Sequence, residues 1–201
     1  MNTRDSLHVG LLRRGVKAKL PRTFQPEECI GDGKSLGLIE VDLGPIRWIN
    51  VRRLHVEGAD VVRADLGIPD MRLHKFPEVE RIEIASRSGK DAAARWRGND
   101  LDLGIIEALN RDEALQGELA PAGRSMPDFF TDWHEDAGVV IHAHPEQRCW
   151  TISFSVETRM PVILGLFGGR RLRVPQSTEL AAYQQIARIL LNNRLSNVWD
   201  N

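Results

Sequence analysis

Cysteine is almost absent from this chain of 201 residues. Only Cys29 and Cys149 occur, and they lie far apart in the sequence. Two cysteines are too few for a disulfide framework or for a zinc site built from four thiolates. We therefore expect a protein of a reducing compartment, of which the cytoplasm is the simplest.

Long apolar runs and an excess of one charge are missing too. The 27 Lys and Arg residues nearly balance the 28 Asp and Glu residues, so no whole-molecule field favours nucleic acid or an anionic membrane. The longest apolar run, at residues 161–169, is too short to span a bilayer, and the N-terminus lacks the apolar stretch of a secretory signal. We expect no membrane partner.

The order of apolar and polar residues along the chain predicts an α+β fold whose main element is an antiparallel sheet. Apolar and polar residues alternate over residues 36–86, with a Gly44-Pro45 turn between two strands, and again over 138–174. The second region contains a candidate hairpin with Gly168-Gly169 as its turn. Whether these two hairpin-rich regions join in one sheet is left open by the pattern.

Two segments carry helical signals. Residues 101–119 predict short central helices, broken near residues 110–112. Apolar residues at helical spacing over 177–193 predict a C-terminal helix packed on the sheet, with Ser177 or Thr178 as its cap.

The first 30 residues differ from the rest of the chain, because basic residues dominate there and apolar periodicity is weak. They predict a basic, irregular N-terminal arm over 1–30. Residues 31–201 then form a single α+β domain. The loop at 120–136, rich in proline, glycine and acidic residues, marks an alternative division into two lobes.

The stretch VVIHAHPEQRCWTISFSV, residues 139–156, predicts a β-hairpin with its tip at Glu146 and Gln147. This register places Cys149 opposite His144. Six apolar side chains then share the face expected to pack on the core: Val139, Ile141, Ala143, Trp150, Ile152 and Phe154. Five polar side chains share the opposite face, which is expected to face solvent: His142, His144, Cys149, Thr151 and Ser153.

That polar face and the loop before it collect residue types that bind zinc. The candidate ligands are His142, His144, Cys149, Asp132, His134, Glu135 and Asp136. A zinc ion there would activate water for hydrolysis, with Glu135 or Glu146 as proton acceptor. The alternative, which we favour, is a solvated polar face that binds no metal, with Cys149 as an inert residue and not a nucleophile.

The sequence His142-x-His144-Pro145 after an apolar strand resembles, over about fifteen residues, the zinc motif of JAMM-type metalloproteases. The resemblance implies a metal-bound water that attacks a peptide or isopeptide carbonyl. In that family a serine follows the second histidine at plus eight and an aspartate ligand at plus eleven. This chain has Ile152 and Ser155 there, so the third ligand is missing and we do not assign the chain to the family.

Two arginine-rich segments suggest a different partner. They are Arg95, Trp96 and Arg97 in one place and Arg170, Arg171 and Arg173 in another. Together they predict basic strips with an aromatic platform for single-stranded nucleic acid. The alternative is exposed arginines beside a buried Trp96.

The fingerprints of nucleotide and dinucleotide sites, Gly-x-x-x-x-Gly-Lys-Ser/Thr and Gly-x-Gly-x-x-Gly, do not occur in the sequence. We therefore expect a small cytoplasmic, bacterial-type accessory module that binds another protein, for example a toxin-neutralising one, without a cofactor or chemistry of its own. A metal-dependent hydrolase at His142 and His144 is the alternative, and nucleic-acid binding through the arginine strips is a further one.

Overall fold

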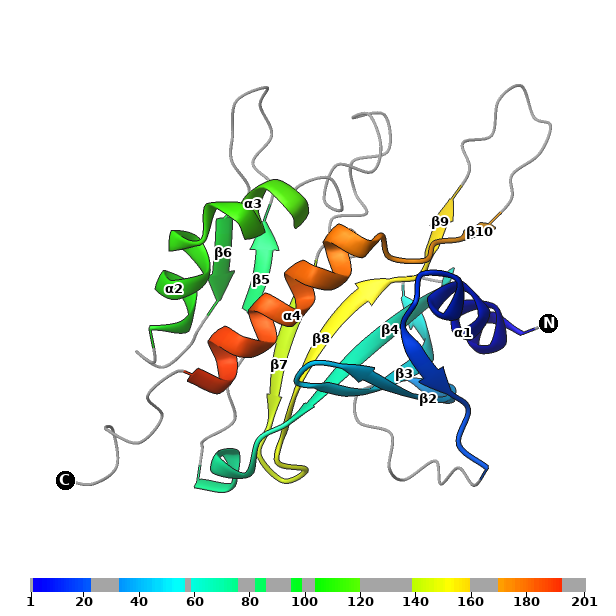
Figure 1. The fold of residues 1–201 in the computed structure, drawn as a ribbon, viewed down its shortest axis with the longest axis horizontal. Helices are drawn as coiled ribbons and strands as arrows, with labels where there is room; N and C mark the ends of the chain where they lie inside the picture. Colours follow the sequence, from blue (N-terminus) through cyan, green and yellow to red (C-terminus); the bar gives the residue numbers. More distant parts are fainter. Residues whose placement is uncertain are drawn as a thin grey trace.

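The structure is a computed structural model that describes residues 2–22, 33–56, 59–75, 82–85, 95–98, 104–119, 139–159 and 170–192. These residues form an eight-stranded antiparallel sheet, a separate two-stranded sheet and four α-helices (Figure 1). The predicted α+β class is therefore confirmed. Among the described helices, none has the length and apolar character needed to cross a bilayer.

The large sheet has the strand order β1-β2-β3-β4-β8-β7-β5-β6. Its strands are β1 (Lys17–Lys19), β2 (Lys34–Leu43), β3 (Ile46–Val56), β4 (Ala59–Pro69), β5 (Ile82–Ala85), β6 (Arg95–Gly98), β7 (Val140–His144) and β8 (Cys149–Ser155). The small sheet pairs β9 (Glu157–Arg159) with β10 (Arg170–Leu172). The helices are α1 (Thr3–Arg13), α2 (Ile105–Arg111), α3 (Glu113–Leu119) and α4 (Ser177–Asn192), and a short 3-10 helix covers Met71–Lys75.

The β4–β8 pairing joins the two strand regions that the sequence left unconnected. Leu66 of β4 lies opposite Ile152 of β8, and both side chains are buried. The β7–β8 hairpin has the predicted register, with His144 opposite Cys149. Because the two regions share one sheet, their apolar side chains form one core.

Helix α4 packs across one face of the sheet, as predicted, with α2 and α3 beside it near β5 and β6 (Figure 1). Its Tyr183 ring stacks on Phe154 of β8 at a centroid distance of 5.2 Å. The predicted caps Ser177 and Thr178 are wrong. The helix begins at Ser177, so the capping position belongs to Gln176. The backbone N–H of Gln176 donates to the Glu179 carboxylate at 2.7 Å.

The predicted irregular arm is wrong for the described part of residues 1–30. Helix α1 occupies Thr3–Arg13, and the Asn2 side chain caps it by accepting the Asp5 N–H at 2.8 Å. Leu7 and Leu11, one turn apart, are fully buried. Two leucines suffice to dock a short helix but are too few to produce a strong apolar periodicity. Residues 23–30 of the predicted arm lie outside the described residues.

The predicted turn at Gly168-Gly169 is wrong in its pairing. A two-residue turn there would place residue 167 opposite Arg170, whereas Arg170 pairs with Arg159 of β9. Strand β9 follows β8 directly after Val156. Strand β10 therefore pairs with the segment that continues the β7–β8 hairpin. The loop at 120–136 lies outside the described residues, and the division into two lobes stays a prediction.

Candidate functional site

The face of the large sheet that points away from the core carries most of the polar side chains of its central strands. Ile49 and Val51 of β3 are buried in the core, so the alternate residues Trp48, Asn50 and Arg52 lie on the opposite face. We call this face the polar face. The register aligns Trp48 with Gly67, Thr151 and His142 across four neighbouring strands: β3, β4, β8 and β7.

The prediction that this face of the hairpin is solvated is wrong for three of its five residues. Cys149, Thr151 and Ser153 are only 3%, 2% and 1% exposed, whereas His142 and His144 are half-buried. Strand β8 is an interior strand between β4 and β7, so neighbouring side chains cover its polar groups. In an isolated β7–β8 hairpin, without β4 beside β8, these polar groups would be exposed.

A hydrogen-bonded network satisfies the buried polar groups. Asp65 of β4 accepts hydrogen bonds from the Arg52 guanidinium of β3 and from the Ser153 hydroxyl of β8. Breaking one partner of such a buried pair leaves an uncompensated charge. The network therefore fixes the register of three adjacent strands, and we assign it a structural role.

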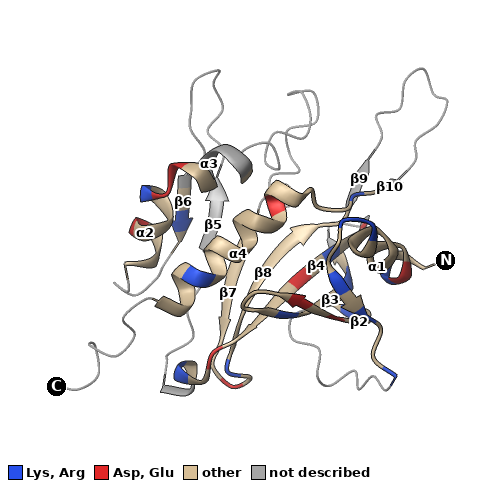
Figure 2. Ribbon diagram, in the orientation of Figure 1, with Lys and Arg blue, Asp and Glu red and all other residues tan. Residues whose placement is uncertain are grey.

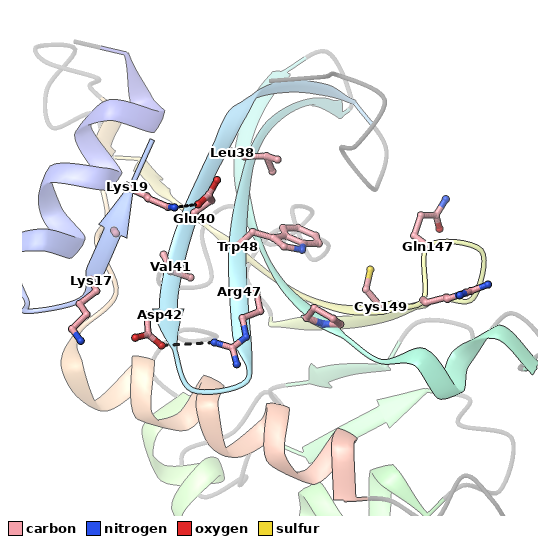
Figure 3. A pocket seen from close by; sticks show the side chains of 13 residues that line it. Lys17, Lys19, Leu38, Glu40, Val41, Asp42, Arg47, Trp48, Gln147 and Cys149 are labelled. Atoms are coloured by element: carbon pink, nitrogen blue, oxygen red, sulfur yellow. Dashed lines mark ion pairs between the residues drawn. The ribbon is translucent and has the colours of Figure 1, made fainter. Parts of the chain in front are cut away.

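An open cavity of about 850 Å³ has Trp48 and Cys149 of the polar face in its lining. Its lining residues come from β1, β2, β3, the end of β4 and the β7–β8 turn: Lys17, Ala18, Lys19, Leu38, Glu40, Val41, Asp42, Arg47, Trp48, Pro69, Gln147, Arg148 and Cys149. Figure 3 shows Leu38 and Trp48 directed toward the same space as Gln147 and Cys149. We call it the Trp48 cavity, and its volume falls within the range of ligand-binding pockets.

Trp48 lies directly on the backbone of Gly67. A Cβ atom added at Gly67 would be 1.8 Å from Cε2 of the indole, which is closer than any real contact. Glycine is therefore required at position 67 for the ring to lie there, a common reason for glycine inside a strand. The Trp48 side chain remains half-buried and lines the cavity.

Charged side chains surround this apolar centre. Lys19 pairs with Glu40 at 2.6 Å, and Arg47 lies 3.8 Å from Asp42 (Figure 3). Figure 2 shows residues of both signs interspersed along α1, β2 and β3. The cavity thus has an aromatic floor and a polar rim, the arrangement of many recognition sites.

The predicted zinc ligands fall into two groups. His142 and His144 lie on β7 with ring centroids 6.1 Å apart, and Nε2 of His144 is 2.9 Å from Oγ1 of Thr151. Within the described part of the chain, no three His, Cys, Asp or Glu side chains form a group that could hold a metal ion. The loop candidates Asp132, His134, Glu135 and Asp136 lie outside the described residues, so a site combining them with the two histidines stays a prediction.

Cys149 lacks the lowered pKa of a nucleophilic cysteine. Burial raises the pKa of its thiol to about 12. The thiol is therefore protonated at neutral pH, whereas reactive cysteines have a lowered pKa. This agrees with the interpretation of Cys149 as an inert residue.

The two arginine strips lie far apart in the fold. Arg95, Trp96 and Arg97 belong to β6, at one edge of the large sheet, whereas Arg170 and Arg171 belong to β10 at the other side of the molecule (Figure 1). Trp96 is 2% exposed, and its backbone N–H and C=O both bond to the Asn110 side chain of α2. Its ring is buried and does not form a stacking platform. Arg173 pairs with Glu179. Nucleic-acid binding through the remaining arginines stays a prediction.

A Gly-x-Ser-x-Gly pattern, the sequence mark of a serine-hydrolase nucleophile, lies at residues 33–37. The functional motif requires a sharp turn between a strand and a helix. Here Ser35 lies within β2 beside a bulge, and its hydroxyl donates to Oδ1 of Asn50 at 2.7 Å. Ser35 is therefore a hydrogen-bonded strand residue and not the nucleophile of such a turn.

The chain matches no protein-family model, no curated protein and no solved structure at a significant level.

Proposed function

We propose that this protein is a non-catalytic module that binds another protein through the Trp48 cavity. The observation that carries the proposal is the Trp48 indole on Gly67, partly exposed at the floor of an open cavity. Tryptophan is the residue type most enriched among side chains that dominate binding energy at protein interfaces. A toxin-neutralising module of the cytoplasm is one form that such a protein takes.

The composition of the lining supports a macromolecular partner. Leu38, Pro69 and Trp48 supply apolar surface to the lining, and paired charges such as Lys19 and Glu40 belong to it as well. An apolar centre with a polar rim is the usual anatomy of a protein interface. The protonated Cys149 thiol beside it is suited to packing and not to covalent chemistry.

The test measures partner affinity and not capture alone. The intact chain is used to isolate bound proteins from the source cell, and a captured partner is purified so that calorimetry can compare its affinity for the intact chain, Trp48→Ala and Leu12→Ala. Leu12 is the matched control because it is an exposed apolar residue (46% exposed) outside the cavity lining.

We expect Trp48→Ala to weaken the Kd at least about tenfold, as truncation of a central tryptophan does, and Leu12→Ala to leave it unchanged. Equal affinity of all three folded proteins would contradict a role for the cavity. Retention of zinc by the intact chain, lost in a His142→Ala, His144→Ala double variant, would instead favour the hydrolase alternative.

A further inference from the structure

The charges at the Trp48 cavity do not balance. Its lining contains four cations, Lys17, Lys19, Arg47 and Arg148, and two anions, Glu40 and Asp42. The two anions are already engaged by Lys19 and Arg47. Within the described part of the chain, Lys17 and Arg148 have no carboxylate partner, and both side chains are exposed. Two positive charges at the rim are therefore available to a ligand.

The backbone at Arg148 is a second, independent observation. Its φ of 51° lies in the left-handed region, and it is the one described residue other than glycine with a positive φ. Glycine or asparagine usually occupies such a position at the end of a hairpin turn. The turn is held by the Arg148 N–H donating to the Pro145 carbonyl at 3.1 Å and by the Asp70 N–H donating to the Arg148 carbonyl at 2.8 Å. Strained backbone of this kind is concentrated at functional sites, and here it places an arginine on the cavity rim.

The free edge of β1 is a less suitable place for a ligand. An added strand would bond to the outward backbone groups of β1, but Nε2 of His8 already bonds to the Ala18 carbonyl at 3.2 Å. Helix α1 also packs against this short strand. A ligand of the cavity therefore lies over the polar face and does not extend the sheet.

We infer that the Trp48 cavity binds an acidic peptide segment of the partner protein, with an apolar side chain of that segment against the Trp48 indole. This inference rests on the proposed function and specifies the chemistry of the partner. Carboxylates of the segment lie at Lys17 and Arg148, where the guanidinium can take a carboxylate by two parallel hydrogen bonds. A volume of about 850 Å³ accommodates a few side chains of such a segment.

The test selects peptides from a random dodecapeptide library displayed on phage, panned on the intact chain. Enriched sequences are synthesised, and their Kd is measured by fluorescence anisotropy at low and moderate salt. The variants are Trp48→Ala, Trp48→Phe and the charge-reversed pair Lys17→Glu with Arg148→Glu. Arg188→Glu is the matched control, because Arg188 is exposed on α4 and does not line the cavity.

We expect enriched peptides with at least two acidic residues beside an aromatic or aliphatic one. Trp48→Ala and the charge-reversed pair should each weaken binding about tenfold or more, with Trp48→Phe within about threefold of the intact chain and Arg188→Glu unchanged. Higher salt should weaken binding severalfold, because exposed charges are screened. Circular dichroism checks that each variant is folded.

The possible failures are distinguishable. Enriched peptides that depend on Trp48 but carry no acidic residues, or that bind the charge-reversed pair equally well, overturn the acidic-segment inference and leave the proposed function in place. Peptides that bind Trp48→Ala as tightly as the intact chain, together with a protein partner that does the same, overturn both. A library that yields no enriched peptide also overturns the inference.

Discussion

The contact between Trp48 and Gly67 makes the substitution Gly67→Ala a sharp test of the cavity floor. A Cβ atom at position 67 would lie 1.8 Å from Cε2 of the indole, and real Cβ contacts are not shorter than 3.0 Å. The indole therefore has to move by about 1.2 Å or rotate off the strand. Gly67 does not have a positive φ, so the alanine backbone itself is unstrained. We expect a loss of about 1–3 kcal/mol in the free energy of unfolding, the usual cost of overpacking.

Urea denaturation of a double-mutant cycle isolates this cause. In the Trp48→Ala background the clash is gone, and Gly67→Ala should be neutral or stabilising by up to about 1 kcal/mol, because alanine restricts the unfolded chain. The coupling free energy between the two substitutions should therefore exceed about 1 kcal/mol. An equal cost of Gly67→Ala in both backgrounds would refute the stacking of Trp48 on the glycine.

Three further predictions concern the rest of the fold. Leu11→Ala should lower the free energy of unfolding by about 2–5 kcal/mol, because Leu11 is fully buried in α1; an undocked N-terminus would show almost no change in urea denaturation. Burial opposes the charge of Asp70, but hydrogen bonds from Arg72 and Trp150 outweigh it and lower its pKa. The stability that this carboxylate contributes is therefore present above the unfolded-state pKa of about 3.9 and lost as pH falls through the folded-state pKa. Asp70→Asn should accordingly cost about 1–3 kcal/mol at pH 7, with the difference from the intact chain shrinking below pH 4; a constant difference across that range would contradict the assignment. In a Cys29→Ser background, Cys149 should react with iodoacetamide only after unfolding, because its pKa is about 12; fast labelling of the native protein at pH 7 would oppose a buried, protonated thiol.

The strands and the register of the β7–β8 hairpin could be predicted from the sequence. Alternation from Val139 to Phe154 specifies two faces, and a turn at Pro145 to Arg148 specifies the register, so local information is sufficient. The apolar stripe of α4 is equally local.

The environment of that hairpin could not be predicted, because it depends on β4. Asp65 and Arg63 of β4 lie beside Ser153 and turn a surface position into a buried one. Long-range pairing of this kind leaves no periodic signal in β8 itself. Helix α1 was missed for a related reason: its packing depends on two leucines, and its start depends on the single cap Asn2.

Two features of the sequence indicate the candidate site. Both can be interpreted only when the register of the strands is known. Trp48 is two residues from Asn50 and four from Arg52, so a strand places it on their polar face, where an aromatic side chain is unexpected. Gly67 lies inside the long strand β4, where glycine is uncommon. Their contact across β3 and β4 follows from the pairing of Trp48 with Gly67, which sequence spacing does not determine.

Site-specific photo-crosslinking in living cells tests most directly whether the Trp48 cavity is where this chain meets its partner. Gln147 is exposed on the cavity rim, and its replacement by p-benzoylphenylalanine should yield one dominant adduct with another protein. The adduct should be lost when Trp48→Ala is added, and the same probe at Arg188 should not form it. Equal adducts at both positions, or an adduct at Gln147 that persists in Trp48→Ala, would contradict the assignment of the cavity as the binding site.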